Sequence, residues 1–521
     1  MDLKQQLIHR KYKKCEAKNQ ITIGDDYSVP DGKPDVSKIL QKRAEVSVEE
    51  VTTEKGKVKI RGSLKVWVFY LAERSSKIAE SILMEFPFEE TLYMDGASSG
   101  DNLKIDWTIE ELRVTIVHPG KLDVRSVIML QGVILGSESH QVTENIEETD
   151  GIYTKGESFA VAEPVFDRKD SFRIRDEVSL PANKPNVQKI LWQNVQMNGL
   201  DIRIQEDRLG IKGECRLFVV YEGEEDPAAI QWFEQSVPFQ GTLEVAGLTG
   251  EMFGTLDTEV SHKTVDIKPD YDGEPRSFQL EMMLDIYMHI YEERTCMRLK
   301  DAYSTKEQLN MQTQQICFEK LRMCNQAKCG IQGKQKLETE EKVLQILGSY
   351  AEIVNRRSRR TEQGILCEGT LQIQLLYVTV SDREPFGSIG MEIPYSQLVE
   401  IPGMEQGDVW KITETIDQLF VTMQESNLAE VKGSLKFQVC VMEQCVLENV
   451  TDISREEQDM EVYKKRPGMV IHFVQPKETL WELAKAYWTT TEEIRKLNDL
   501  PGEEVTAGQK LLLMKSCREA L

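Results

Sequence analysis

An internal repeat constrains this chain more than any other feature of its sequence. Residues 28–40 and 179–191 agree at eight of thirteen positions, and both contain a Lys-Pro pair. The same offset of 151 positions continues through the pairs Gly62/Gly213, Tyr70/Tyr221, Pro87/Pro238, Phe88/Phe239 and Gly96/Gly247. Because chance similarity does not hold one register over about a hundred residues, the chain contains duplicated domains.

A third, more divergent copy keeps a constant offset of 307 from the first. Its equivalences are Val36/Val343, Ile39/Ile346, Leu40/Leu347, Gly62/Gly369, Tyr70/Tyr377, Pro87/Pro394 and Gly96/Gly403. The Lys-Pro pair of the first two copies, Lys33-Pro34 and Lys184-Pro185, is absent, and Glu341-Lys342 stands in that region. We therefore expect that the third copy lacks the role of the Lys-Pro pair or fills it differently.

Each copy has the periodicity of β-strands. In the first copy Leu64, Val66, Val68 and Tyr70 occupy alternate positions, which predicts a half-buried strand. The recurring tyrosines are expected to pack in cores. Only residues 36–40, behind a proline, are predicted as a short helix. The predicted fold is mainly β, with three tandem β-sandwich or barrel-like repeats followed by a small βααβ module.

More polar stretches separate the repeats. We place the three repeats at residues 28–144, 179–293 and 334–451. Residues 294–333 form a polar connector, in which residues 306–320 are predicted to be helical. Residues 1–27 form a basic leader, either an interaction tail or a solvated helix, with Arg10, Lys11, Lys13 and Lys14.

The composition excludes several kinds of partner. The formal charge of −23 opposes binding to nucleic acid or to anionic lipid. No apolar run approaches the ~20 residues of a transmembrane helix. The polar first residues lack the apolar segment of a secretory signal. We therefore expect an intracellular protein without a transmembrane segment.

No pattern of metal ligation or catalysis stands out. The ten cysteines include no CxxC, and the loose cluster of Cys317, Cys324 and Cys329 has no fitting histidine. We expect reduced thiols, no metal and no cofactor. The six histidines do not pair, and no hydrolase, Walker-type or dinucleotide-binding motif is present. We therefore expect no catalytic residues and no enzymatic activity.

A different pattern runs from residue 469 to residue 515. Thr479 and Glu482 have the spacing of a capping box that starts a helix, and Thr490 and Glu493 repeat it. The side chains expected to face inward on these two helices are Leu480, Leu483, Ala484, Tyr487, Ile494 and Leu497. Alternating apolar residues before and after the helices predict one strand at each end.

The sequence from Val474 to Ala484, followed by Asn498 and Gly508-Gln509, resembles a LysM domain over the whole module. This resemblance implies that N-acetylglucosamine glycans bind between the loop before the first helix and the loop after the second. LysM domains commonly have Gly-Asp-Thr before the first helix, whereas this chain has Lys477-Glu478-Thr479. A long cationic side chain in place of glycine makes glycan binding doubtful.

Three β repeats with the Lys-Pro motif and a C-terminal LysM module together resemble the SipL group of spore-coat morphogenetic proteins of endospore-forming anaerobes. The repeats look like SPOCS domains, and the resemblance covers about residues 28–514. It implies a scaffold in the mother-cell cytoplasm, located at the forespore surface in the spore coat. It also implies that the LysM module binds SpoIVA, the ATPase of the coat's basement layer, and leaves the repeats available for other coat proteins.

Two functions are therefore compared: a protein-binding scaffold, and a binder of peptidoglycan or cortex glycan. For either function the partner-binding surface is expected to comprise Lys477, Glu478, Thr479, Leu480, Trp481, Asn498, Leu500 and Pro501. Trp481 follows Leu480 on the first helix. It is expected either at the surface, where an aromatic residue can anchor a partner, or packed beneath the second helix.

Overall fold

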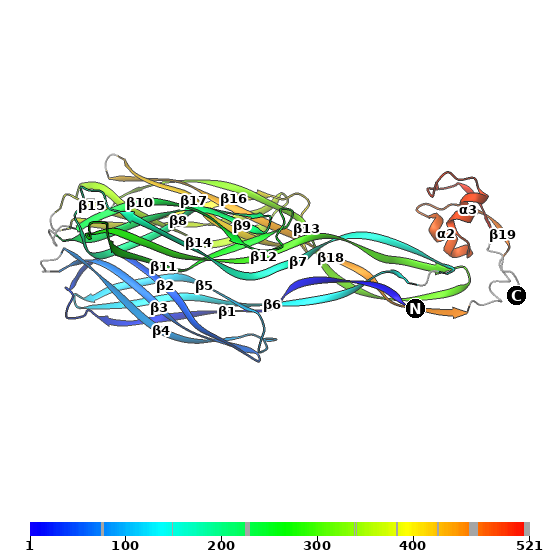
Figure 1. The fold of residues 1–521 in the computed structure, drawn as a ribbon, viewed down its shortest axis with the longest axis horizontal. Coiled ribbons are helices and arrows are strands. Elements are labelled where there is room, and N and C mark those ends of the chain that lie inside the picture. The colour runs from blue at the N-terminus through cyan, green and yellow to red at the C-terminus, as the bar shows by residue number, and fades with distance from the viewer. Residues whose placement is uncertain are drawn as a thin grey trace.

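The three repeats are six-stranded bodies that lie side by side, as the computed structural model shows (Figure 1). The structure describes residues 1–73, 78–147, 150–224, 230–337, 339, 341–381, 384–424, 427–457 and 467–514. Repeat 1 comprises β1 (Leu3–Ser28), β2 (Val36–Glu54), β3 (Lys57–Ala72), β4 (Ala79–Tyr93), β5 (Leu103–His118) and β6 (Lys121–Ile146). Repeat 2 comprises β7 (Ile152–Ser179), β8 (Val187–Gln205), β9 (Arg208–Gly223), β10 (Ile230–Glu244), β11 (Phe253–Pro269) and β12 (Pro275–Ser304). Repeat 3 comprises β13 (Glu307–Lys336), β14 (Val343–Arg360), β15 (Gly364–Thr379), β16 (Phe386–Glu400), β17 (Val409–Gln424) and β18 (Leu428–Glu457).

Every repeat is a sandwich of two three-stranded antiparallel sheets. The second, third and fourth strands form one sheet in that order, and the first, sixth and fifth strands form the other. In repeat 1 the predicted inward residues Leu64, Val66 and Val68 of β3 share a core with Val124 and Ile128 of β6. The predicted mainly-β fold is thus confirmed, and of the two predicted forms the repeats adopt the sandwich.

The predicted basic leader, residues 1–27, is not a separate segment. It forms β1, which pairs with β6 from Leu3 opposite Ile146 to Ser28 opposite Lys121. Ile21 and Ile23 of this strand are buried in the core of repeat 1. Each sandwich therefore begins one strand earlier than predicted, because the partner that makes the first strand regular lies more than 90 residues later in the chain.

The helix predicted in the connector is also wrong. Residues 294–333 form the end of β12 and most of β13, and β13 pairs with β18 along its length. Ile316 and Phe318 are buried while Gln315 and Cys317 are exposed, which is the period of a strand. The polar, glutamine-rich composition suits a helix locally, but the long partner strand supplies backbone hydrogen bonds that override this preference.

The short helix predicted at residues 36–40 is replaced by the start of β2. The hydroxyl of Tyr70 donates to the carbonyl oxygen of Pro34 at 2.8 Å, and that of Tyr221 donates to Pro185 at 3.2 Å. These bonds hold the segment after the proline extended beside the third strand. The recurring tyrosine and Lys-Pro pair are therefore structural partners in repeats 1 and 2.

The repeats pack around a common apolar core through equivalent side chains. Leu40, Leu191 and Leu347 are buried there together, at the same position of the three second strands. A second set at equivalent positions is Phe69, Val220 and Leu376, and a third is Ala79, Ile230 and Phe386. The duplicated sequence thus builds an approximately three-fold arrangement in one chain, in which every copy covers the apolar faces of the other two.

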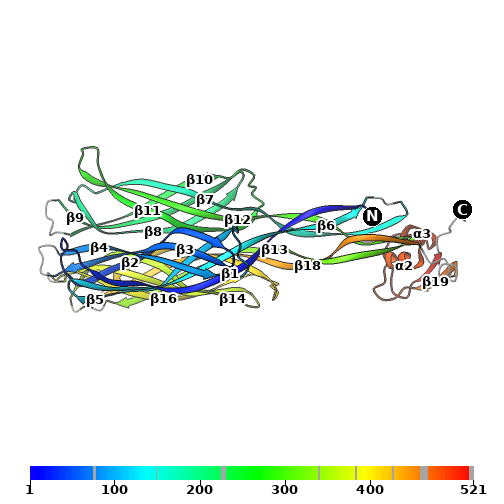
Figure 2. The same cartoon turned by 90° about the horizontal axis from the view of Figure 1, so that it is seen from below.

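The first and last strands of the repeats extend beyond the sandwiches. Figures 1 and 2 show β6, β7, β12, β13 and β18 running out together towards the C-terminal module, and the N-terminus lies beside them. We call this extension the stalk. Its interior contains the buried residues Ile8, Val142, Val161, Cys296, Ile316 and Leu447. Strands of all three repeats contribute, so the stalk joins the repeats a second time through an apolar cluster of its own.

One pair of cysteines departs from the expected reduced state. Cys324 of β13 and Cys440 of β18 form a disulfide. The two residues lie directly opposite each other in the antiparallel ladder. Spacing along the chain does not reveal this pairing, because the two cysteines are 116 residues apart.

The C-terminal module has the predicted βααβ order. It comprises β19 (Met469–Phe473), α2 (Leu480–Tyr487), α3 (Thr491–Leu497) and β20 (Lys510–Met514), with β19 and β20 antiparallel. Both predicted capping boxes are present. Leu497 is 37% exposed rather than inward-facing, and residue 515 lies outside the described residues. Across the described chain, no helix has the length and apolar character to cross a membrane.

Candidate functional site

The predicted binding surface begins at a tight turn before α2. Lys477 has a φ of 70°, the left-handed conformation that glycine adopts with little strain, and its side chain is exposed. Thr479 then caps α2, because its hydroxyl accepts a hydrogen bond from the amide of Glu482 at 3.3 Å. A lysine ammonium is thus displayed at the rim, at a position where the backbone itself favours glycine.

Glu478, in the same turn, is directed inward. Its carboxylate accepts a hydrogen bond from the amide of Gln475 at 2.8 Å and lies 2.7 Å from Nε2 of His472. Burial opposes ionisation of Glu478, but the amide and the imidazole outweigh it and hold its pKa below the usual range. The carboxylate therefore stabilises the turn, which leaves Lys477 as its exposed charge.

Three other predicted surface residues have structural roles. Leu480 is 2% exposed and belongs to the core of the module, so its assignment to the surface is wrong. Asn498 exchanges two hydrogen bonds with the backbone of Leu512, which tie the end of α3 to β20. Leu500 packs against the core, and Pro501 is exposed.

Trp481 lies on the surface of the module, as one of the two predictions has it, but its indole faces the stalk. It is half-buried against the end of the stalk, where its indole Nε1 donates to the Asp301 carboxylate at 2.8 Å. The ring of Tyr303 meets the indole edge-to-face, with centroids 4.9 Å apart. The ammonium of Lys155 lies 6.0 Å from the indole centroid. Trp481 thus belongs to the surface of the module, and residues of repeat 2 cover it.

Two further contacts join the module to the same stalk end. Lys485, one turn after Trp481 on α2, pairs with Asp301 at 2.6 Å. The hydroxyl of Tyr303 donates to the carbonyl oxygen of Thr489 at 3.1 Å. Tyr303 is buried in one apolar cluster with the module's core residues. Asp301 and Tyr303 of β12 together form the docking point for α2.

Sequence reasoning missed these stalk residues. Asp301 and Tyr303 precede Trp481 by about 180 residues and fall inside the stretch predicted to be a connector. The sequence did contain a signal for these residues. Tyr153 and Tyr303 are aromatic residues next to the two junctions that bound repeat 2, where most neighbouring residues are polar. In the structure these two rings stack at 5.3 Å, one on each strand of the terminal β7–β12 pair.

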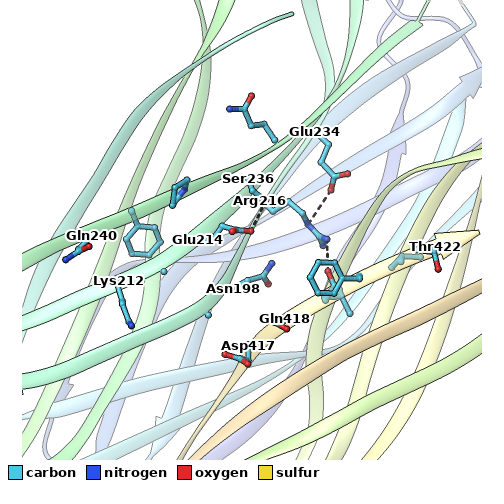
Figure 3. Close-up of a pocket in the computed structure, with 18 residues that line it drawn as sticks. Asn198, Lys212, Glu214, Arg216, Glu234, Ser236, Gln240, Asp417, Gln418 and Thr422 are labelled. Carbon is cyan, nitrogen blue, oxygen red and sulfur yellow. Dashed lines mark hydrogen bonds and ion pairs between the residues drawn. The ribbon is translucent and has the colours of Figure 1, made fainter.

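A second candidate site is an open groove of about 1080 Å³ between repeats 2 and 3 (Figure 3). Its polar lining residues include Asn198, Lys212, Glu214, Arg216, Glu234, Ser236, Gln240, Asp417, Gln418 and Thr422. Arg216 crosses the groove, donating to the carbonyl oxygens of Leu419 at 3.2 Å and Ser349 at 3.1 Å. This guanidinium thus links β9 of one repeat to β14 and β17 of the next.

The charged groups of the groove have partners inside it and beside it, since Lys212 pairs with Asp201 and Asp417 with Lys328, both outside the lining. Arg216 lies 3.4 Å from the carboxylate of Glu234, and Ser236 donates to Glu214 at 2.7 Å. Burial raises the pKa of Glu234, and the guanidinium opposes that rise. The groove is therefore a polar seam that fixes the two repeats. Among the described residues, no cluster of three or more histidine, cysteine or acidic side chains is arranged to hold a metal ion.

Comparison with known protein families agrees with this architecture. The family model described as "SipL, SPOCS domain" matches residues 35–117, 186–268 and 342–424, and the LysM domain model matches residues 472–513. Searches of curated proteins and of solved structures return no match. Each SPOCS match starts near the second strand of a sandwich and ends near the fifth, so the strands that build the stalk lie outside it. With three SPOCS domains and a terminal LysM domain, the chain belongs to the SipL family.

Proposed function

We propose that this protein is a non-enzymatic scaffold of endospore coat assembly. Its LysM domain docks the coat's basement-layer ATPase, SpoIVA, and so holds the two proteins together at the forespore surface. The scaffold acts in the mother-cell cytoplasm and becomes part of the spore coat. The three repeats provide the rigid body that presents the LysM domain, and they can take further coat proteins on their outer faces.

The observation that carries this proposal is the rim of the LysM domain. Exposed Lys477 holds a left-handed backbone position suited to glycine in the turn before α2, and Trp481 lies in the first turn of that helix. An ammonium and an indole on one domain suit a protein surface that combines carboxylates with an apolar pocket, since both kinds of contact anchor protein interfaces. N-acetylglucosamine offers the indole a stacking partner, but the sugar is uncharged and gives the ammonium no ion-pair partner.

The rigid body supports the same proposal. The three sandwiches share an apolar core, and the stalk extends from them to the LysM domain. A docking domain at the end of a stiff extension keeps its partner away from the repeats, which leaves their outer faces free for other components. Several modest contacts on one rigid chain then combine into strong attachment.

The test compares Lys477→Glu with the native full-length chain. Reversal of this exposed charge is expected to weaken capture of purified SpoIVA by at least about tenfold, because like charges then face each other. Lys496→Glu, a reversal at an exposed lysine of α3 that is not among the residues of the expected surface, serves as the matched control. Sedimentation with purified peptidoglycan is measured in parallel. Equal capture of SpoIVA by all three proteins would show that Lys477 is not part of the docking surface. Sedimentation with peptidoglycan without any capture of SpoIVA would favour the glycan-binding function instead.

A further inference from the structure

The indole that the proposed function uses as an anchor is already in contact with the stalk. Trp481 donates to Asp301, meets Tyr303 edge-to-face, and lies near Lys155. Lys477 and Pro501, at the other end of the expected surface, remain exposed. One half of the docking surface is therefore open and the other half is covered by repeat 2.

The covering surface is chemically matched to α2. The single carboxylate of Asp301 binds two groups one helical turn apart, the indole N–H at 2.8 Å and the ammonium of Lys485 at 2.6 Å. The phenol of Tyr303 reaches past α2 to the carbonyl oxygen of Thr489. These groups recognise the position and the direction of α2, so the contact is specific rather than a chance apposition.

The end of the stalk is built to present these residues. Lys155 and Asp301 are direct partners in the terminal β7–β12 ladder, and so are Tyr153 and Tyr303. Tyr153 stacks on Tyr303 and fixes the plane of the ring that meets Trp481. Because β7 and β12 continue into the shared core, this surface is held rigidly, whether or not the LysM domain is on it.

We propose that the end of repeat 2 is an internal binding surface for the LysM domain, and that it holds the domain in a closed state which a protein partner must displace. This inference rests on the proposed function for the role of Trp481. The partner first meets exposed Lys477, and the release of α2 from Asp301 and Tyr303 then exposes the indole. The closed state lowers the apparent affinity for the partner, because only the open fraction of the molecules can bind it.

The contact is of the right strength for such a switch. Among the described residues it includes one indole hydrogen bond, one solvent-accessible ion pair, one phenol hydrogen bond and one aromatic pair, each of which contributes modestly on its own, together with the burial of the Tyr303 ring. Attachment to the same chain raises the effective concentration of the domain at the stalk, so these few contacts suffice to keep it closed. A partner that covers Trp481 with a larger surface outcompetes them.

The experiment uses the full-length chain and Asp301→Ala, with Asp452→Ala as the matched control. Asp452 is exposed on β18, near the end of the same stalk. Acrylamide quenching of Trp481 is measured first, as the fluorescence difference between each protein and its Trp481→Phe version, since the chain has seven tryptophans. Quenching of this indole should rise in Asp301→Ala and stay at the native level in Asp452→Ala.

Affinity for purified SpoIVA is measured second. Asp301→Ala should bind at least about fivefold more tightly than the native chain, because the closed state no longer competes. Lys485→Ala breaks the same ion pair from the other side and should shift quenching and affinity in the same directions. Unchanged quenching in both variants would overturn the closed state without reference to any partner. Increased quenching with unchanged or weaker affinity would overturn the competition, and no binding by any variant would refute the proposed function instead.

Discussion

The chain has two kinds of internal junction, and they differ in chemistry. Among the repeats, Phe69, Val220 and Leu376 meet in a core from which water is excluded. Between the stalk and the LysM domain, one buried ring, that of Tyr303, is combined with directional bonds made by Asp301 and Tyr303. Apolar burial contributes in proportion to area and has no preferred direction, whereas a few polar contacts can be broken and reformed locally. The first junction is therefore permanent, and the second is suited to exchange partners.

The repeat junction also contains a polar layer, which shows how duplication has diverged. Equivalent positions on the three second strands hold Arg43, Asn194 and Tyr350. Arg43 donates to the backbone of repeat 2 at Gln193 and lies over the ring of Trp67 at 4.7 Å. If the three positions held identical residues, like groups would meet and the repeats could be interchanged. Because the three side chains differ, the repeats can pair in one order only.

The largest expected effect comes from the apolar junction. Phe69→Ala should lower the free energy of unfolding of the repeats by about 3–5 kcal/mol, because the ring is fully buried where the repeats meet. Urea unfolding followed by circular dichroism measures the change. The LysM domain should keep its own transition, since none of its side chains enters that core.

Leu83→Ala provides the matched control for this substitution. Leu83 belongs to the neighbouring strand β4 but is 51% exposed, so its removal should leave the unfolding transition within about 0.5 kcal/mol of native. If Phe69→Ala proved as mild as Leu83→Ala, the repeats would behave as independent sandwiches and the contrast between the two junctions would disappear.

An intermediate effect is expected from Lys263 of β11, which is partly buried where the three repeats meet. Burial, and after it the charge of Arg43, lower the pKa of Lys263 to about 8 against the opposing effect of Glu45 and Glu352. In the unfolded chain Lys263 keeps its proton up to the usual lysine pKa near 10.5. Below pH 8 the folded protein must bury the charged amine, which lowers its stability, and this loss of stability disappears as the pH rises. Lys263→Met should therefore be more stable than native by up to about 3 kcal/mol at pH 7.

The pH dependence separates this effect from simple repacking. The stability difference between Lys263→Met and the native chain should shrink between pH 7.5 and pH 9.5, as the native lysine loses its proton in the folded state. Urea midpoints of both proteins at each pH give the difference, and groups common to both cancel. A difference that stays constant over this range would show that Lys263 keeps an ordinary pKa at the junction.

The sequence predicts what each repeat contains but not how the repeats join. The register of the duplication and the alternation from Leu64 to Tyr70 are local, so the mainly-β fold could be derived from them. The first strand of each repeat is polar on most positions and becomes a strand only beside its distant partner, as β1 does beside β6. Its burial pattern depends on the assembled stalk, which no local pattern encodes.

In the LysM domain, too, local features could be predicted from the sequence and contacts with distant residues could not. Its helices begin at Thr479 and Thr490 as the capping boxes predict, because a capping box is complete within four residues. The exposure of Trp481 could not be decided from helix geometry, since the residue that covers it belongs to repeat 2. The disulfide between Cys324 and Cys440 escaped prediction for the same reason: register between distant strands, and not spacing, brings the two cysteines together.

The smallest expected effect tests the polar junction at one atom. Tyr303→Phe removes the hydroxyl that donates to Thr489 and keeps the ring that meets Trp481, so the closed state should lose about 0.5–1.5 kcal/mol. Acrylamide quenching of Trp481 should increase slightly, and the urea transition of the repeats should not move. Tyr153→Phe is the matched control, because Tyr153 contributes its ring to the stack beside Tyr303 and should leave quenching at the native level. A shift of the repeat transition in Tyr303→Phe would mean that the stalk end and the repeat core unfold as one unit, and the LysM domain could then not leave the stalk without cost to the core.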